Sequence, residues 1–170
     1  MRKNIVLIAS LDAKGHACYY VKNFIENKGY NVVSVDVGTE VVKAAASNTD
    51  EVFAPGKTDQ ENRVVDTMTE GMTRVCHDLF AECRMDGIIC IGGATETIVG
   101  TKVMSMLPSG IPKVMLSTLT SDEICQYVSP KGDICMLSSS DETAGLNGIP
   151  KISLLQAAGA LIGMAEAENA

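Results

Sequence analysis

An unbroken apolar run that ends in two glycines is the part of the sequence best suited to bind an anion. Residues 88–91 are Ile-Ile-Cys-Ile, and Gly92 and Gly93 follow directly. This run predicts a strand buried on both faces, and the apolar spacing after it predicts a helix over residues 94–107. At the carboxyl end of a parallel strand, the amides and dipole of the next helix can hold a phosphate or a carboxylate. The alternative is a tight corner that needs glycine only for positive φ.

Polar residues follow the other predicted strands in the same way. They are Asp12, Lys14 and Gly15 after residues 4–10, Asp36 near the end of residues 32–37, and Ser117 and Thr118 after residues 113–116. Because the carboxyl ends of parallel strands share one edge of a sheet, we expect these residues to lie near the Gly92-Gly93 turn. Lysine suits phosphate as a flexible point charge. In the alternative interpretation, Lys14 is only solvated and Asp12 caps the first helix.

No other motif in the sequence indicates a named reaction. There is no P-loop, no Ser-His-Asp set and no cluster with metal-ligand spacing, so a catalytic residue cannot be assigned and no metal site is predicted. The six cysteines form no CxxC pair and fit best as small buried apolar residues.

Length and charge restrict the class of protein. The 170 residues suit one domain over residues 1–170, and the net charge of −7 argues against a nucleic-acid binder. No apolar stretch is long enough to span a membrane, and residues 5–11 are too short for a signal peptide core. We therefore expect a cytoplasmic protein with no membrane partner.

Strand and helix patterns alternate along the chain. Strands are predicted over residues 4–10, 32–37, 88–91, 113–116 and 134–137. The first predicted helix ends near Gly29, and three more are predicted over residues 60–83, 94–107 and 152–167. This alternation predicts an α/β fold, a Rossmann-like, doubly wound and mainly parallel sheet in three layers, with strand order 2-1-3-4-5. Residues 39–59 are expected to form a long functional or partner-binding connection.

The order of the loop sequences resembles a known family. The segments that carry the likeness are Ser10-Leu11-Asp12-Ala13-Lys14-Gly15, Val35-Asp36-Val37-Gly38, Ile91-Gly92-Gly93, Pro112-Lys113 through Ser117-Thr118, Tyr127-Val128, Asp141 with Ala144-Gly145-Leu146-Asn147, and Ala157-Ala158-Gly159-Ala160 with Gly163-Met164. Over residues 4–165 they resemble the ATP-binding domain family typified by the amino-terminal half of the tomato mosaic virus resistance protein, whose bacterial relatives are of uncharacterised function. Each segment alone is common, and their order makes the match specific.

This resemblance implies a Rossmann-like domain that binds ATP, tends to form homodimers and is often joined to a second domain, encoded separately or missing from this chain. Carried over by position, Asp12 and Lys14 lie beside the nucleotide, Gly92 and Gly93 let amides approach phosphate, and Ser117 and Thr118 donate hydrogen bonds to it. The full set expected at the cofactor is Asp12, Lys14, Gly15, Asp36, Gly92, Gly93, Ala94, Thr95, Thr97, Ser117 and Thr118.

Two segments depart from the pattern of that family. Residues 94–97 read Ala-Thr-Glu-Thr where the family has a serine and a glycine pair, and residues 120–123 read Thr-Ser-Asp-Glu where it often has alanine-serine-glycine-aspartate. Both changes place carboxylates near the expected phosphate. An unpaired carboxylate there costs on the order of 1 kcal/mol or more, so ATP needs magnesium between it and Glu96, or the ligand differs.

Three classes of function remain open from the sequence. The first is a nucleotide-binding domain, regulatory or serving a second domain or partner. The second is an enzyme acting on a small phosphorylated or carboxylated metabolite. The third is a dimerisation module whose ligand site has decayed. Self-association is also expected because nine methionines and six cysteines supply more apolar surface than the core needs.

Overall fold

The computed structural model describes residues 2–37, 59–127, 133–139 and 149–167. Within these ranges, only the backbone is described for residues 11–14, 59–62, 64 and 126–127. The expected connection over residues 39–59 lies almost wholly outside the described residues, as do Val128, Asp141 and residues 144–147 of the family pattern.

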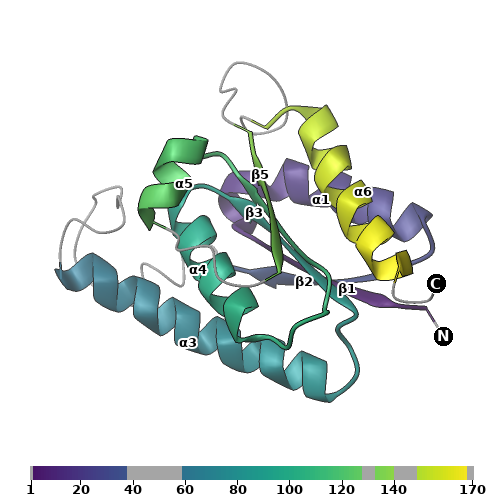
Figure 1. Ribbon diagram of the computed structural model, residues 1–170, viewed down its shortest axis with the longest axis horizontal. Coiled ribbons are helices and arrows are strands. Elements are labelled where there is room, and N and C mark those ends of the chain that lie inside the picture. Colours follow the sequence, from purple (N-terminus) through teal and green to yellow (C-terminus); the bar gives the residue numbers. More distant parts are fainter. Residues whose placement is uncertain (1, 38–58, 128–132, 140–148, 168–170) are drawn as a thin grey trace.

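Five parallel strands form one sheet, and their order is the predicted one. The order is β2 (Asn31–Asp36), β1 (Asn4–Ala9), β3 (Gly87–Gly92), β4 (Lys113–Ser117) and β5 (Ile134–Ser138) (Figure 1). All four pairings are parallel. The carboxyl ends of β1, β3 and β4 therefore lie side by side, which places the Gly92-Gly93 turn between two neighbouring strand ends.

Helices cover both faces of the sheet and complete the three layers. α1 (Leu11–Asn27) and α6 (Lys151–Ala167) pack on one face, and α3 (Asp59–Ala81) and α4 (Ala94–Met106) pack on the other (Figure 1). A short helix, α5 (Ser121–Tyr127), follows β4. The fold is thus the predicted Rossmann-like α/β architecture. None of the helices in the described part of the chain is long and apolar enough to cross a membrane.

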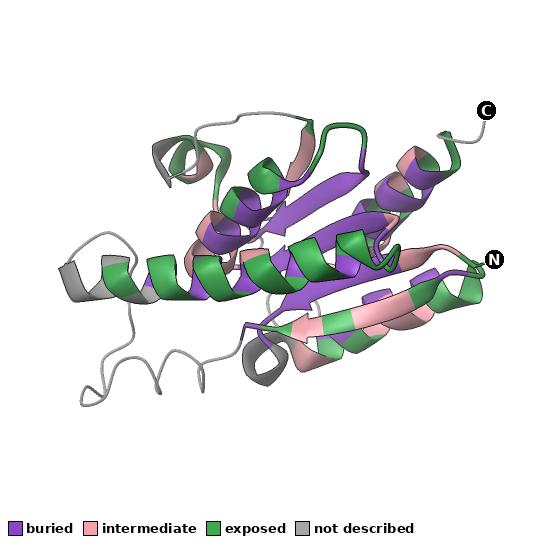
Figure 2. Ribbon diagram, turned by 90° about the horizontal axis from the view of Figure 1, so that it is seen from below, coloured by how far each residue is buried: buried purple, intermediate pink, exposed green. Residues whose placement is uncertain are grey.

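Successive side chains along each strand pack alternately into two separate hydrophobic cores, one on each face of the sheet. Ile5 and Leu7 of β1 face the core under α1 and α6, whereas Val6 and Ile8 face the core under α3 and α4. Figure 2 shows the central strands as buried throughout and the edge strand β2 as only partly buried. Burial on both faces explains the unbroken apolar runs, since each buried aliphatic side chain stabilises the fold by about 1.5 to 3 kcal/mol.

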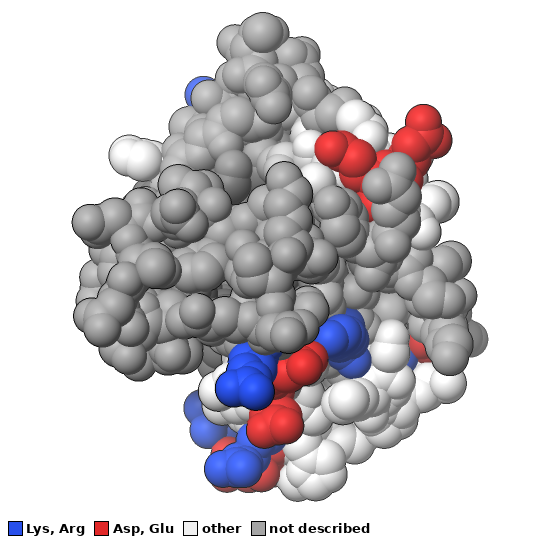
Figure 3. Space-filling model, turned by 90° about the vertical axis from the view of Figure 1, so that its left-hand side faces the viewer, with Lys and Arg blue, Asp and Glu red and all other residues white. Residues whose placement is uncertain are grey.

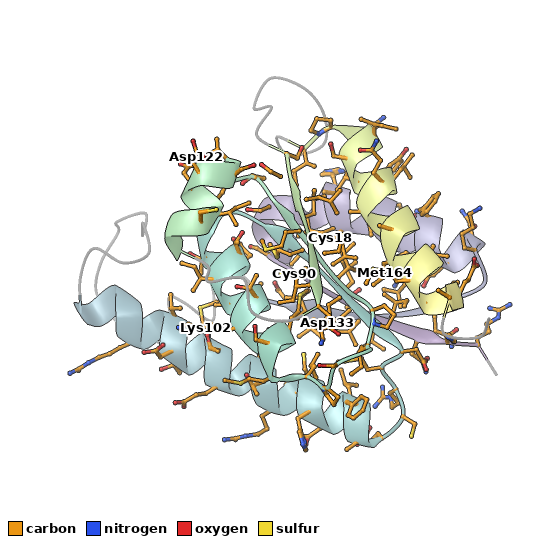
Figure 4. All side chains as sticks on the ribbon, in the orientation of Figure 1. Cys18, Cys90, Lys102, Asp122, Asp133 and Met164 are labelled. Carbon is orange, nitrogen blue, oxygen red and sulfur yellow. The ribbon has the colours of Figure 1, made fainter. Side chains whose placement is uncertain are left out.

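Close packing of α4 on β3 depends on one glycine. A Cβ atom at Gly100 would lie 2.6 Å from Sγ of Cys90, which is fully buried beneath the helix (Figure 4). Burial raises the pKa of the Cys90 thiol well above its ordinary value. Cys90 is therefore a neutral packing residue, and the missing side chain at Gly100 lets α4 pack closely on β3.

Three details of the sequence prediction are wrong. Residues 11–15 are not a loop, because α1 begins at Leu11 immediately after Ser10. The helix α5 was not expected, although Thr120 and Glu123 form the capping pattern that starts it. Cys18, Cys76 and Cys90 are buried as predicted, but Cys83 and Cys125 are exposed.

Candidate functional site

The turn after β3 and the turn after β4 are hydrogen-bonded to each other. The N–H of Thr118 donates to the carbonyl of Gly92 at 2.9 Å, which extends the strand pairing by one residue past the end of β4. Gly93 follows Gly92, and a Cβ atom at Gly93 would lie 3.6 Å from Thr118 Oγ1. The structure thus brings four of the predicted residues, Gly92, Gly93, Ser117 and Thr118, to one point of the rim.

Two buried hydroxyl groups join these turns from inside. Thr97 Oγ1 donates to the carbonyl of Gly93 at 2.6 Å and lies 2.8 Å from Ser117 Oγ. Both side chains are fully shielded from solvent. The predicted grouping of Thr97 with Ser117 is therefore present, but the hydroxyls point at the protein backbone rather than outward.

Neither glycine of the turn has a positive φ. Gly93 has φ −86°, and the glycines with positive φ in the described residues are Gly29 and Gly110. At Gly92, however, a Cβ atom would lie 2.5 Å from Cγ and 2.8 Å from Cδ of Glu96. The tight-corner interpretation is wrong, because Gly92 makes room for a side chain.

Glu96 uses that room to reach the start of its own helix. Its Oε2 accepts a hydrogen bond from the N–H of Gly93 at 3.0 Å, so the third residue of α4 caps the residue before the helix. An acid in the first turn also suits the positive end of the helix dipole. One of the amides expected to bind phosphate is therefore held by a carboxylate of the protein.

The acidic residues at positions 122 and 123, the second difference from the family pattern, have a similar structural explanation. Glu123 Oε2 accepts from the N–H and from Oγ1 of Thr120, each at 2.8 Å, and Thr120 Oγ1 in turn accepts from the N–H of Glu123 at 3.4 Å. These hydrogen bonds lower the pKa of Glu123. Asp122 is exposed on α5 (Figure 4). Glu123 therefore caps α5, as Glu96 caps α4.

The remaining predicted residues lie in the first turn of α4, at the end of β2 and in α1. Ala94 and Thr95 are half-buried in the first turn of α4, and Asp36 is exposed at the end of the edge strand β2. Asp12 and Lys14 belong to the first turn of α1, but their side chains are outside the described part. The N-cap of α1 is Ser10, so the interpretation of Asp12 as the cap is wrong.

Gly15 lies within α1 and has open space beside it, since no described atom outside the backbone of its own helix lies within 4 Å of the Cβ position. The structure therefore brings the α4 turn and the β4 turn together by direct hydrogen bonds, whereas Gly15 lies in α1 and Asp36 at the end of β2, on the same edge of the sheet.

Sequence reasoning missed two serines at the end of β5, Ser138 as its last residue and Ser139 directly after it. Ser138 Oγ donates to the carbonyl of Leu119 at 2.6 Å, and the N–H of Ser139 donates to the carbonyl of Ser117 at 2.8 Å. A polar run directly after a predicted strand was the available signal, the same one that pointed to Ser117 and Thr118. Three neighbouring strands, β3, β4 and β5, thus contribute backbone or hydroxyl groups to one network.

The charges near this edge do not form a metal cluster. Within the described ranges, no group of three or more His, Cys, Asp or Glu side chains is placed to hold a metal ion. On the face drawn in Figure 3, one group of described side chains is acidic and another mixes basic with acidic residues. The Glu96 carboxylate, in the first turn of α4, could contribute one ligand to a magnesium ion.

Curated bacterial proteins resemble almost the whole chain. A UPF0261 protein of Clostridium tetani is 34% identical over 174 residues, which cover 96% of this chain and 43% of that protein. A UPF0261 protein of Rhizobium meliloti is 33% identical and matches 96% of this chain and 42% of its own length. The chain therefore spans less than half the length of these relatives.

Two more distant similarities extend to other proteins. The ToMV susceptible protein tm-1(GCR26) of Solanum lycopersicum is 27% identical over 106 residues, 62% of this chain and 14% of that protein. A solved structure titled a putative hydrolase of the alpha/beta superfamily, from Xanthomonas campestris pv. campestris, has a TM-score of 0.49 and 10% identity over 99% of both chains. Similarity at that level carries no argument about activity.

The family model described as "Uncharacterised protein family (UPF0261) N-terminal domain" matches residues 3–170. With the bacterial relatives, this match covers both halves of the sheet and every described rim residue. The chain belongs to the UPF0261 family, as its N-terminal domain.

Proposed function

We propose that this domain binds ATP, with magnesium, at the rim where the β3–α4 turn meets the β4–α5 turn. The observation that carries the proposal is the hydrogen bond from Thr118 N–H to the Gly92 carbonyl, which sets a helix N-terminus and a hydroxyl-bearing loop at the carboxyl edge of a parallel sheet. The resemblance to an ATP-binding family supports the choice of nucleotide.

The first turn of α4 supplies donors for a phosphate. In any helix the first amides have no partner within the helix, which at α4 applies to the N–H groups of Ala94, Thr95 and Glu96. A methyl group at Gly93 would reach only ordinary contact distance, 3.6 Å from Thr118 Oγ1 and 3.7 Å from Glu96 Oε2. Gly93 therefore faces Thr118 and Glu96, whose side chains are proposed to contact the phosphate and the magnesium ion.

Magnesium is part of the proposal because of Glu96. Its carboxylate accepts the Gly93 N–H, so a phosphate that approaches the same turn meets a negative charge. A magnesium ion held between phosphate oxygens and Glu96 converts that repulsion into coordination. Lys14, in the first turn of α1, is proposed to contact the phosphates from the neighbouring strand end.

Calorimetric titration of ATP, with and without magnesium, tests the proposal. Lys14→Ala is expected to weaken binding by about 1 to 3 kcal/mol as a lost charge-assisted contact, and Gly93→Val is expected to abolish it. The matched control is Lys22→Ala, which removes a half-buried lysine two turns further along α1 whose Nζ lies 3.8 Å from Glu26 Oε1. If Lys14→Ala and Gly93→Val both bind as the parent does, the rim is not an anion site.

A second function is favoured by one specific observation. The Glu96 carboxylate on the Gly93 amide occupies the place of an anion without any ligand, which is what a decayed site retained in a dimerisation module would show. Under this alternative no nucleotide binds, and light scattering still gives a mass near twice the monomer mass of 18.0 kDa. A dimer that also binds ATP supports the first proposal instead.

The wider role proposed for the domain is to serve a second domain or a partner chain, in the cytoplasm, as a homodimer. Support comes from the length of the bacterial relatives, of which this chain matches 43% and 42%. Co-purification of the domain with the remaining part of such a relative, compared with the domain alone, measures whether the two parts bind each other.

A further inference from the structure

We infer that Thr97 and Ser117 hold the β3–α4 turn and the β4–α5 turn in position through a chain of hydrogen bonds in which every donor points the same way along the chain. Neither hydroxyl contacts the ligand. This inference rests on the proposed function only for its effect on affinity. The coupling between the turns is a property of the protein with or without a nucleotide.

The direction of the protons follows from the partners at each end. The Gly93 carbonyl can only accept a hydrogen bond, so the Thr97 hydroxyl donates its proton to that carbonyl, at 2.6 Å. At the other end, Ser117 Oγ accepts from the N–H of Leu119 at 3.1 Å. In the 2.8 Å contact between the two hydroxyls, Ser117 is therefore the donor and Thr97 the acceptor. The chain runs from Leu119 N–H through Ser117 and Thr97 to the Gly93 carbonyl.

This chain links residues that are adjacent in space but distant in sequence. Gly93 and Thr97 begin α4, whereas Ser117 and Leu119 end β4 and start the next turn. Beside it runs a backbone hydrogen bond from Thr118 N–H to the Gly92 carbonyl. The two connections hold the turns in one relative position.

The network also anchors the turn after β4 from the far side. The Leu119 carbonyl accepts from Ser138 Oγ at 2.6 Å, and the Ser117 carbonyl accepts from Ser139 N–H at 2.8 Å. Leu119 is therefore held through both its N–H and its carbonyl. A site whose loops are fixed before binding loses less conformational entropy when a ligand arrives, so these hydroxyls raise affinity without contacting the ligand.

The burial of Thr97 and Ser117 indicates that they position the turns and do not contact the ligand. Ser117 has no exposed surface and Thr97 has none, while the neighbouring Thr118 is half-buried. A ligand at the rim would meet Thr118 and the backbone amides before it could meet either hydroxyl. The expected contribution of Ser117 and Thr97 is therefore indirect.

Amide hydrogen exchange by NMR, with Thr97→Val and Thr97→Ser, tests the coupling. Thr97→Val removes the hydroxyl and leaves Ser117 without its acceptor, so exchange at the Leu119 and Thr118 amides should rise on the order of ten-fold. Thr97→Ser keeps the hydroxyl and should restore exchange to the parent rate. If Thr97→Val fails to fold, Ser117→Ala breaks the same chain from β4.

The matched control is Thr101→Val. Thr101 is buried one turn further along α4 and donates to the Thr97 carbonyl at 2.6 Å, so its loss removes an equivalent hydroxyl that links no turns. The inference predicts parent exchange rates at Leu119 in this variant. Equal acceleration in Thr97→Val and Thr101→Val would overturn it, because the effect would then be general loosening of α4.

ATP titration of the same variants separates this inference from the proposed function. Weaker binding in Thr97→Val, with faster exchange and rescue in Thr97→Ser, supports both. Faster exchange in a protein whose parent form binds no ATP overturns the proposed function and leaves the coupling supported. Lost binding with parent exchange rates would show that Thr97 contacts the ligand, which overturns the inference.

Discussion

Glu96 lies across Gly92 and binds the N–H of Gly93, with Oε2 3.0 Å from the nitrogen. The side chain fits only because Gly92 carries no Cβ, since such an atom would lie 2.5 Å from Glu96 Cγ. The most conspicuous glycine pair of the sequence therefore serves two purposes. Gly92 admits the capping glutamate, and Gly93 presents the amide that the glutamate binds.

The two glycines are expected to differ in their tolerance of alanine. Gly92→Ala should destabilise the domain by about 1 to 3 kcal/mol through overpacking against Glu96. Gly93→Ala should stay within about 0.5 kcal/mol, because its φ is negative and its nearest neighbours are at contact distance. Urea unfolding measures both. The double variant Gly92→Ala with Glu96→Gly should recover stability relative to Gly92→Ala; no recovery would mean that another contact causes the loss.

Glu96→Gly distinguishes the two proposed functions. If Glu96 helps to hold magnesium on bound ATP, the variant should bind ATP more weakly, and only when magnesium is present. If Glu96 merely fills a decayed site, the variant should gain ATP binding in either condition, because it removes the charge and frees the Gly93 amide. Calorimetry with and without magnesium measures the sign. An unchanged affinity would contradict both interpretations of Glu96.

An ion pair between a buried lysine and an exposed aspartate, at the opposite end of β4, should control stability without affecting the rim. Lys113 is 2% exposed, and its Nζ lies 2.6 Å from Asp133 Oδ1 and 2.9 Å from the Pro108 carbonyl. Asp133→Ala leaves this lysine buried without its counter-ion and should cost about 3 kcal/mol. Lys113→Met should cost less, about 1 to 2 kcal/mol, because Asp133 is 39% exposed and can be hydrated.

The control for this pair is Lys102→Met, which breaks the exposed Lys102–Asp66 contact of 3.1 Å between α4 and α3. It should change the free energy of unfolding by less than about 1 kcal/mol. Equal losses in Asp133→Ala and Lys102→Met would contradict the argument from burial.

The same ion pair predicts a loss of stability in acid. The hydrogen bond from Lys113, and then that from the Gly110 N–H, lower the pKa of Asp133 in the folded state. A lowered folded pKa stabilises the protein above the unfolded pKa of about 3.9, and this contribution is lost as the pH falls through the folded value. Urea unfolding below about pH 4 should show a smaller acid-dependent loss for Lys113→Met than for the parent. Parallel pH curves would contradict the assignment.

Cys83 is expected to be replaceable by glycine with a gain in stability. It follows α3 with φ 56°, and the Arg84 N–H donates to the Leu79 carbonyl at 2.8 Å, as in a helix end closed by a left-handed residue. Cys83→Gly should raise the free energy of unfolding by about 0.5 to 1 kcal/mol. The control is Cys125→Gly, inside α5, which should lower it. A loss in both variants would mean that the Cys83 side chain has its own packing role.

Most of the fold could be predicted because strands that are buried on both faces have unbroken apolar sequences. Residues 5–9 and 88–91 are apolar at every position, and a strand with both faces covered is the arrangement that this pattern favours in an alternating α/β chain. The resulting strand order predicts that Gly92, Gly93, Ser117 and Thr118 lie at one edge of the sheet. The family resemblance pointed to the same edge.

The start of α1 and the whole of α5 could not be placed in this way. Leu11 to Gly15 contain polar residues and a glycine, which suggested a loop, yet the helix begins directly after Ser10. The seven residues of α5 are too few to show a periodic apolar stripe. Short or polar helices depend on their caps and on packing around them more than on pattern.

The sequence by itself determined that a glycine turn and two hydroxyl-bearing residues meet at the carboxyl edge of the sheet, because the alternation of buried strands and helices allows few other arrangements. Only the tertiary structure decided what those residues do there. Thr97 and Ser117 are 20 positions apart, and their 2.8 Å contact exists because β3 and β4 are paired in one register. The hydrogen bond from Gly93 to Glu96 likewise depends on how the Glu96 side chain crosses Gly92, an arrangement that the missing Cβ permits and that the packing of the turn selects.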